Sequence, residues 1–312
     1  MTAPGGEVTG SDDFDVVTGA FSYSGAAIAS GLQAAGRRVR TLTGHPGRAP
    51  AGTAIEVRPL AFGDPAGLTE SLRGARTLYN TYWVRFAHGR VSHETAVAQS
   101  RVLFQAAAEA GVRRVVHVSI THPDPDSPYP YFRGKAAVEQ ALGDFGLSHA
   151  VLRPAILFGG NGVLLNNIAW LLRRLPVFAV GGSGEYRVRP IHVDDLARLS
   201  VQAGKSTETE VVDAVGPERP TFLELVHFIK DAVGSRSQVI RVPGPLIPPA
   251  ARLLGLTLRD TLLTGDEYQA LADGLADTDG PATGEASLTQ WITDHKGTLG
   301  RTYANELARH FR

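Results

Sequence analysis

Short apolar runs alternate with amphipathic stretches along the first two thirds of the chain. The first run, FDVVT at residues 14–18, has the length of a buried strand, and a glycine-containing turn follows it. Residues 24–35 then place apolar side chains at helical spacing until Gly36 ends the pattern. This strand, turn and helix form the first of several βα units, which are typical of a parallel sheet.

The same alternation predicts further strands and the helices that connect them. The strands are expected at residues 38–42, 54–57, 76–79, 114–119 and 148–152. The helices are expected at residues 65–72, 92–110 and 131–142. The sequence therefore predicts an α/β fold, a Rossmann-type doubly wound parallel sheet.

Beyond Arg153 the pattern loosens, because proline and glycine interrupt the apolar runs. Less regular helices are expected near residues 221–232 and 245–254 and from 288 to the end, and residues 275–287 are expected to form a surface loop. We therefore expect a disordered tail at 1–13, an NAD(P)-binding Rossmann domain at 14–160 with a returning element to about 214, and a smaller mixed α/β substrate-binding lobe at 161–312.

Composition excludes several classes of protein. The chain has 312 residues, 43% of them hydrophobic and 20% charged, which is typical of a globular protein with room for a core and a cleft. Thirty-one basic residues balance thirty-one acidic ones, so no global field attracts nucleic acid or an anionic membrane. The absence of cysteine excludes disulfides, thiolate metal sites and catalytic thiols. Residues 1–13 lack the basic start and apolar centre of an export signal. We expect a cytoplasmic protein, a monomer or homodimer, that binds a small-molecule substrate and neither nucleic acid nor membrane.

The turn after the first strand has glycines at the spacing of a dinucleotide-binding loop, in the segment TGAFSYSG. Gly19 would make the tight turn, and Gly25 would let the next helix pack closely on the strand. At the middle position, the Cβ of Ser22 narrows the approach of a phosphate, but its hydroxyl can hydrogen-bond to one. The alternative is a plain βα turn that binds nothing. The candidate pyrophosphate contacts at this positive helix end are Gly19, Phe21, Ser22, Tyr23, Ser24 and Gly25.

The end of the second strand bears on the choice of cofactor. In dinucleotide folds an acid there binds the ribose 2′-hydroxyl, whereas arginine accommodates a 2′-phosphate. No acidic residue lies between Asp15 and Glu56, and the interval carries Arg37, Arg38, Arg40 and Arg48. We therefore favour NADP, with NAD possible, and expect Thr43 and Arg48 to contact the cofactor. The alternative is that these arginines are solvated charges, above all Arg37 and Arg38.

A tyrosine and a lysine stand one helical turn apart in YFRGK at residues 131–135, after a strand that ends in Ser119. Together with TGAFSYSG, this segment resembles the short-chain dehydrogenase/reductase superfamily, in its atypical and extended branch of NmrA-like, epimerase/dehydratase-like and complex I accessory-subunit-like proteins. The similarity covers about residues 14–204. The further matches are Asp64 in FGDP, Asn80 after the fourth strand, RPAILFGG at 153–160 with Pro154, and RPIHVDDLA at 189–197.

The resemblance implies site residues and a chemistry. Asp64 would cap the adenine amino group, and Asn80 and Pro154 would also contact the cofactor. Ser119, Tyr131 and Lys135 would form the catalytic triad. The ordinary pKa of a phenol is about 10, and an ammonium at i+4 would lower it. Ser119 would hold the substrate oxygen while Tyr131 transfers its proton, which serves reduction, alcohol oxidation or epimerisation.

Other polar residues have simpler interpretations. His192, Asp194 and Asp195 resemble a metal cluster, but helix capping explains them better, and no metal is expected. His117 is expected in the core or on a cleft wall. The basic aromatic segment YWVRFAHGRVSHE, with Arg85, His88, Arg90 and His93, could face an anionic substrate or simply be a wet surface.

Two functional hypotheses follow. The first is an NADP-preferring oxidoreductase or epimerase of the atypical short-chain type, which transfers a hydride at a carbonyl or alcohol of a small organic substrate. The second is a non-catalytic NAD(P)-binding redox sensor or accessory subunit on the same fold. The intact pair of Tyr131 and Lys135 favours the enzyme, whereas the short, proline-rich interval between Ser119 and Tyr131 departs from many extended members.

Overall fold

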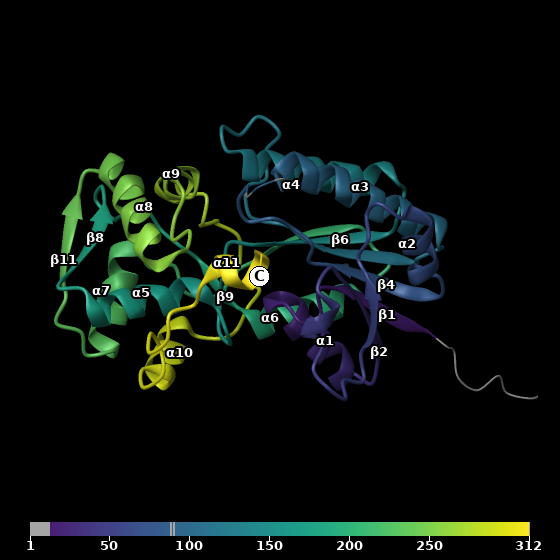
Figure 1. Ribbon diagram of the computed structural model, residues 1–312, viewed down its shortest axis with the longest axis horizontal. Helices are drawn as coiled ribbons and strands as arrows, with labels where there is room; N and C mark the ends of the chain where they lie inside the picture. Colours follow the sequence, from purple (N-terminus) through teal and green to yellow (C-terminus); the bar gives the residue numbers. More distant parts are fainter. Residues whose placement is uncertain (1–12, 88, 90, 312) are drawn as a thin grey trace, which may run out of the picture.

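Residues 13–87, 89 and 91–311 are described by a computed structural model (Figure 1). Apart from Asp13, the expected disordered tail lies outside the described residues. Two lobes lie side by side, one built on the large sheet and the other on helices with two small sheets (Figure 1). The division of the chain into domains at residue 160 stays a prediction.

A seven-stranded parallel sheet forms the centre of the first lobe, in the order β10-β6-β5-β4-β1-β2-β3. The strands are β1 (Phe14–Thr18), β2 (Arg38–Thr43), β3 (Glu56–Pro59), β4 (Ala75–Asn80), β5 (Arg114–Val118), β6 (His149–Pro154) and β10 (Glu210–Ala214). From β1 the chain adds strands toward one edge of the sheet (β2 and β3), and from β4 it adds strands toward the other edge. This change of side between β1 and β4 is typical of doubly wound folds. The predicted Rossmann-type α/β fold class is confirmed.

Helices cover both faces of this sheet (Figure 1). One face carries α1 (Tyr23–Ala34) and α6 (Val193–Ala203), and the other carries α2 (Pro65–Leu72), α3 (His93–Glu109) and α4 (Pro130–Asp144). Successive side chains of a strand point to opposite faces. Val16 therefore packs in the core beneath α2, α3 and α4, whereas Val17 packs in the core beneath α1 and α6.

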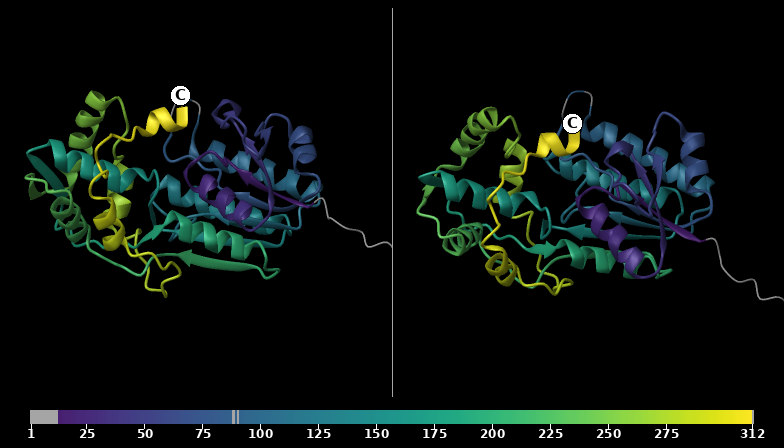
Figure 2. Two further views of the ribbon diagram at one scale, coloured as in Figure 1. Left: turned by 90° about the horizontal axis from the view of Figure 1, so that it is seen from below. Right: turned by 60° about the horizontal axis from the view of Figure 1, so that its bottom comes forward.

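The second lobe has two small parallel sheets. One pairs β7 (Ile156–Phe158) with β9 (Pro190–His192), and the other pairs β8 (Val177–Gly181) with β11 (Gln238–Val242). Its helices are α5 (Val163–Arg174), α7 (Phe222–Ala232), α8 (Ile247–Leu258), α9 (Gly265–Ala272), α10 (Leu288–His295) and α11 (Glu306–Phe311). Short 3-10 turns lie at Pro46–Arg48 and Gly244–Leu246. The final helix α11 lies between the two lobes (Figure 2).

One expectation for this lobe was wrong in detail. The helix expected from 288 to the end is two helices, and in the segment between them Gly300 adopts a φ of +71° and packs against the backbone of Ala169 and Trp170. The expected loop at 275–287 is confirmed, since it contains neither helix nor strand, and hydrogen bonds tie it to the body of the protein. For example, the amide of Arg189 donates to the carbonyl of Ala276 at 2.9 Å. Over the described part of the chain, no helix has the length and apolar character needed to cross a membrane.

Candidate active site

A cleft of 1680 Å³ runs between the two lobes. Its walls come from the start of α1, the start of α4, and the residues of α5, β8, α8 and α9 that face them. Pockets for one small ligand are usually about 300–1,000 Å³. The cleft therefore has room for two ligands, one at the sheet and one in the second lobe.

The glycine turn opens into the sheet end of this cleft. Gly19 has a φ of +68°, a conformation that favours glycine, and its amide donates to the carbonyl of Leu42 at 2.8 Å. A Cβ at Gly25 would collide with the carbonyl oxygen of Gly19, so only glycine lets α1 start this close to the turn. The hydroxyl of Ser22 donates to the same carbonyl at 2.6 Å. The residues of the turn that line the cleft are Phe21, Ser22, Tyr23 and Ser24.

Electrostatics at this turn favour an anion. The first turn of α1 has no acidic residue, so no carboxylate of that turn neutralises the positive end of the helix dipole. The phenol of Tyr23 donates to the carbonyl of Gly159 at 2.8 Å, which joins the turn to the segment after β7. The structure thus brings the predicted turn residues together at one end of the cleft.

Of the arginines near the end of β2, Arg48 lines the cleft. Arg37 pairs with Asp15 at 2.8 Å, and Arg40 pairs with Glu56 at 2.9 Å. The two acids that border the acid-free interval therefore engage arginines inside it. The hydroxyl of Thr43 accepts a hydrogen bond from the amide of His45, within the loop that leads to Arg48.

Three other predicted cofactor residues are not among the residues that line the cleft. Asp64 caps α2, where its carboxylate accepts from the amide of Gly67 at 3.0 Å. Asn80 is fully buried, and its side chain bonds to Thr18, to the amide of Tyr82 and to His117. Pro154 is buried at the end of β6. The side chains of Asp64 and Asn80 thus accept hydrogen bonds from backbone amides outside the cleft lining. Their contacts with a cofactor stay predictions.

Of the predicted triad, Tyr131 lines the cleft, whereas Ser119 and Lys135 are buried behind its wall. The hydroxyl of Ser119 is buried and has no hydrogen-bond partner within the described part of the chain. The ammonium of Lys135 donates to the carbonyl of Val118 at 2.9 Å and lies 4.7 Å from the ring centre of Trp83.

The expected effect of Lys135 on the phenol is therefore wrong for this structure. Burial raises the pKa of Tyr131, the charge of Glu267 raises it further, and Arg85 opposes the shift weakly. Burial also lowers the pKa of Lys135 to about 7, which weakens any positive charge it could offer. Trp83 contacts both side chains, with its ring edge-on to Tyr131 at 5.7 Å between centroids. Tyr131 is consequently a neutral phenol that can donate a proton.

Trp83 and His93 belong to the site although the predicted set did not contain them. Their rings are stacked with centroids 5.8 Å apart, and His93 lies edge-on to Tyr131 at 5.6 Å. Burial lowers the pKa of His93, so its imidazole is neutral at pH 7. A Cβ at Gly134 would stand 2.7 Å from the Trp83 ring, so the glycine of YFRGK makes room for this ring. The sequence signal that could have found Trp83 was the pair of aromatic residues Tyr82 and Trp83, shortly after the fourth strand.

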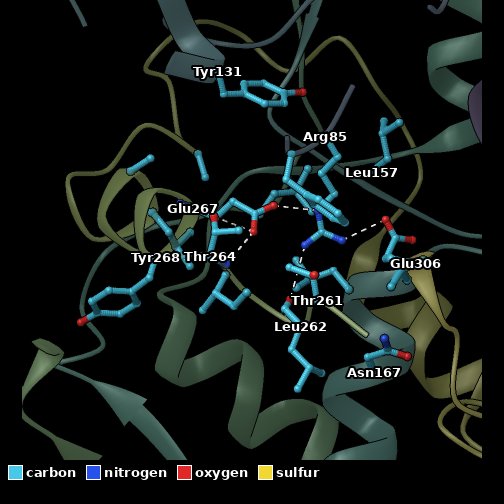
Figure 3. Close-up of a pocket in the computed structure, with 18 of the residues that line it drawn as sticks. Arg85, Tyr131, Leu157, Asn167, Thr261, Leu262, Thr264, Glu267, Tyr268 and Glu306 are labelled. Carbon is cyan, nitrogen blue, oxygen red and sulfur yellow. Dashed lines mark hydrogen bonds and ion pairs between the residues drawn. The ribbon is translucent and has the colours of Figure 1, made fainter. Parts of the chain in front are cut away.

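Arg85 crosses the cleft and is fully engaged (Figure 3). Its guanidinium donates to Glu267 at 2.7 Å, to Glu306 at 2.9 Å and to the carbonyl of Leu262 at 3.4 Å. Burial opposes its charge, but the two carboxylates raise its pKa overall. Arg85 therefore holds two segments of the second lobe instead of an anionic substrate. His88 and Arg90 of the same segment lie outside the described residues.

The other two histidines considered as site candidates, His192 and His117, have structural roles. His192 is the N-cap of α6, and its ring accepts from the amide of Asp194 at 3.2 Å. Asp195 accepts from the amides of Glu285 and Ala286 at 2.9 Å each. The capping interpretation thus holds for His192, whereas the carboxylate of Asp195 holds the segment at 285–286 against the start of α6. His117 is fully buried, and burial lowers its pKa well below the ordinary value, so it is a neutral core residue.

Sequence comparison finds relatives among subunits of a respiratory complex. The chain is 25% identical over 205 residues to the mitochondrial NADH-ubiquinone oxidoreductase 40 kDa subunit of Neurospora crassa, which covers 65% of this chain and 54% of that subunit. It is 26% identical over 144 residues to the mitochondrial NADH dehydrogenase [ubiquinone] 1 alpha subcomplex subunit 9 of Arabidopsis thaliana, which covers 45% of this chain and 36% of that subunit. The match thus spans about half or less of the length of these curated relatives. No protein-family model matches the chain.

Solved structures of reductases and epimerases share the fold. The triphenylmethane reductase of Citrobacter sp., complexed with NADP(H), superposes with a TM-score of 0.72 at 17% identity over 91% of this chain and 99% of that one. The NADPH-dependent quinone oxidoreductase of Escherichia coli, complexed with NADPH, gives 0.73 at 21% identity over 90% and 99%. A nucleoside-diphosphate-sugar epimerase of Staphylococcus aureus gives 0.70 at 15% identity over 90% and 99%.

These similarities agree with the sequence resemblance. The solved structures establish the fold of NAD(P)-binding reductases and epimerases, and the match to the Neurospora crassa subunit covers 65% of the chain. The chain therefore has the Rossmann-type fold of NAD(P)-binding reductases and epimerases, and it is similar in sequence to subunits of mitochondrial NADH-ubiquinone oxidoreductase.

Proposed function

We propose that the protein is an NADP-preferring oxidoreductase that reduces a carbonyl group of a small organic substrate, with Tyr131 as proton donor. The observation that carries the proposal is the position of Tyr131 on the wall of a cleft that also contains the amides at the start of α1. A ligand anchored at the turn and a second ligand beside the phenol would share one cavity.

The residues of the turn fit a dinucleotide. Gly25 lets α1 begin directly against the carbonyl of Gly19, so the positive end of the helix lies at the turn. Arg48 stands on the cleft wall near the end of β2, where a 2′-phosphate would need a cation. When bound, NADPH would supply the hydride. The two neighbours crystallised with NADP(H) and NADPH support this choice of cofactor.

The protonation state of Tyr131 sets which proton transfer the phenol is ready to make. Because its pKa lies above the ordinary value, the phenol carries its proton throughout the physiological range. A protonated phenol can donate to a carbonyl oxygen that gains negative charge during reduction. Removing a proton from an alcohol would instead require the phenolate, which burial disfavours. At physiological pH the enzyme form that is ready to donate a proton to a carbonyl oxygen therefore predominates over the form that could accept one from an alcohol.

The test removes only the hydroxyl of Tyr131. In Tyr131→Phe we expect turnover with NADPH to fall by about 10² to 10⁴, the usual contribution of a positioned acid or base, with NADPH affinity nearly unchanged. Steady-state rates over a panel of aldehydes and ketones measure the effect. Tyr82→Phe removes a hydroxyl that donates to Gln99 and is not among the residues that line the cleft, so it is the matched control and should retain its rate. Undiminished turnover in Tyr131→Phe would discard the assignment.

The second candidate function is a non-catalytic NAD(P)-binding accessory subunit. It is supported by the mitochondrial complex subunits among the relatives and by the engagement of Lys135 with Val118 and Trp83 instead of the phenol. Such a protein would bind NADPH, show no turnover with any carbonyl in the panel, and co-purify with other proteins. The partner of such a subunit would be a protein assembly. The cytoplasmic location is a separate prediction, which cell fractionation tests.

A further inference from the structure

The second-lobe part of the cleft is lined by two apolar helix faces. Along α5, Leu164, Ile168, Leu171 and Leu175 recur at the spacing of one helix face and extend over about 16 Å. Along α8, Ile247, Ala250, Ala251 and Leu254 recur in the same way. Aromatic rings add to these two strips, namely Phe178, Tyr186, Phe222 and Tyr268.

The charged side chains that line the whole cleft are mostly acidic. Within the part of the chain that the structure describes, the carboxylates on the lining are Glu94, Asp194, Asp266, Glu267 and Glu306. The cations on the same described lining are Arg48, at the sheet end, and Arg85. Arg85 already pairs with Glu267 and Glu306, so its charge is compensated (Figure 3).

An anionic substrate would be poorly matched to such a wall. A diphosphate is normally held by arginine forks or lysines, and burying it beside carboxylates without such partners is costly. An apolar body would instead gain from every methylene that leaves water along the α5 and α8 strips. We propose that the substrate is an uncharged, largely apolar carbonyl compound with an extended hydrocarbon or aromatic body, and not a nucleoside-diphosphate sugar.

This inference rests on the proposed function for the carbonyl, but its test measures binding without turnover. Wild-type protein is titrated calorimetrically with 2-hexanone, 2-octanone and 2-decanone, and separately with UDP-glucose. The titrations are made with and without saturating NADP⁺, because a diphosphate could also enter the turn at Gly19. We expect affinity to rise about threefold for each added methylene, and UDP-glucose not to bind once NADP⁺ occupies the turn.

Two variants and a control locate the binding surface. Leu171→Glu places a carboxylate on the α5 strip and should weaken 2-decanone binding at least tenfold. Leu171→Ala only shortens the strip, so it preserves the test if the charged variant does not fold, and it should weaken binding about fivefold. Leu253→Glu changes an exposed leucine of α8 whose side chain is 70% accessible, and it should bind 2-decanone like wild type.

The outcomes separate the two proposals. Ketone binding that strengthens with chain length but gives no turnover with NADPH would support the ligand class and reject the proposed reaction. Turnover of a UDP-sugar would support an oxidoreductase or epimerase and overturn the apolar substrate. An affinity that does not change with chain length, or a Leu171→Glu variant that folds and binds 2-decanone normally, would also overturn it.

Discussion

The two walls of the cleft are built in different ways. The sheet wall is local: Gly19, Ser22 and Gly25 lie within seven consecutive residues, and their backbone contacts shape the turn. The second-lobe wall is assembled over long distances in the sequence. Arg85 is joined to Glu267 and Glu306, which are 182 and 221 residues away along the chain.

The difference shows which changes each wall tolerates. The turn depends on backbone geometry, so a single methyl group in the wrong place disrupts it. The second-lobe wall depends on side-chain pairs and apolar strips, which can lose one member and keep their general shape. The second-lobe wall can therefore change its ligand through a few substitutions, whereas the sheet wall, with its glycine turn, keeps one ligand chemistry.

The largest effect is expected at the turn, from a matched pair of substitutions in α1. In Gly25→Ala the new methyl group collides with the carbonyl of Gly19, so we expect a loss of about 3 kcal/mol in unfolding free energy and loss of NADPH binding. In Gly31→Ala the methyl group meets Val201 at an ordinary 3.4 Å, and the helix should be stabilised by up to about 1 kcal/mol. Urea denaturation and NADPH fluorescence measure both. Equal stabilities of the two variants would contradict the backbone account of this wall.

A second effect concerns Lys135, which is buried behind the sheet wall. In the folded protein its pKa is about 7, whereas the unfolded chain leaves it near 10.5. Between these values the unfolded state binds more protons, so stability rises with pH, with a slope of at most about 1.4 kcal/mol per pH unit. From pH 7 to 9 we expect a gain of about 2 kcal/mol, and the penalty for the buried charge is fully present below pH 7.

Urea midpoints at several pH values up to 9, below the range where most tyrosines of the unfolded chain titrate, test this expectation. Lys135→Met should remove the rise in stability with pH. Lys205→Met changes an exposed lysine and should retain the rise. A wild-type protein whose stability is flat over this range would show that Lys135 keeps an ordinary pKa.

A smaller effect is expected at Arg85. Arg85→Met leaves the partly buried carboxylates of Glu267 and Glu306 without their cation, which should cost about 2 kcal/mol. Hydrogen exchange should become faster in α9 and α11, which Arg85 joins to the segment after β4. Arg101→Met breaks an exposed pair with Asp144 at 3.6 Å and should cost less than about 0.5 kcal/mol. If the two variants were equally stable, the long-range wall would not depend on this pair.

The smallest effect is on cofactor choice. Arg48→Ala should weaken NADPH binding about tenfold and leave NADH binding unchanged, because only NADPH carries the 2′-phosphate. Arg38→Ala, at the exposed start of β2, should change neither affinity. Fluorescence titration of both cofactors measures the difference. Equal wild-type affinities for NADPH and NADH would remove the NADP preference.

Much of the sheet lobe could be predicted because its elements follow from local pattern. The strand FDVVT and the helix at 65–72 have the predicted bounds, and the turn between β1 and α1 lies on the cleft. The second lobe was less predictable. Its strands β8 and β11 pair across 61 residues of sequence, between Val177 and Gln238, and neither was expected from alternation alone.

The sequence by itself determined the fold class and the glycine turn, because period-two and helical spacing and the need for glycine at a crowded backbone are properties of neighbouring residues. It also marked Tyr131. Only the tertiary structure decided that Trp83 lies against both Tyr131 and Lys135, that burial reverses the expected pKa shift of the phenol, and that Arg85 is neutralised by two distant carboxylates. Burial and charge compensation depend on which segments meet in space, and the spacing of residues along one helix or strand does not contain that information.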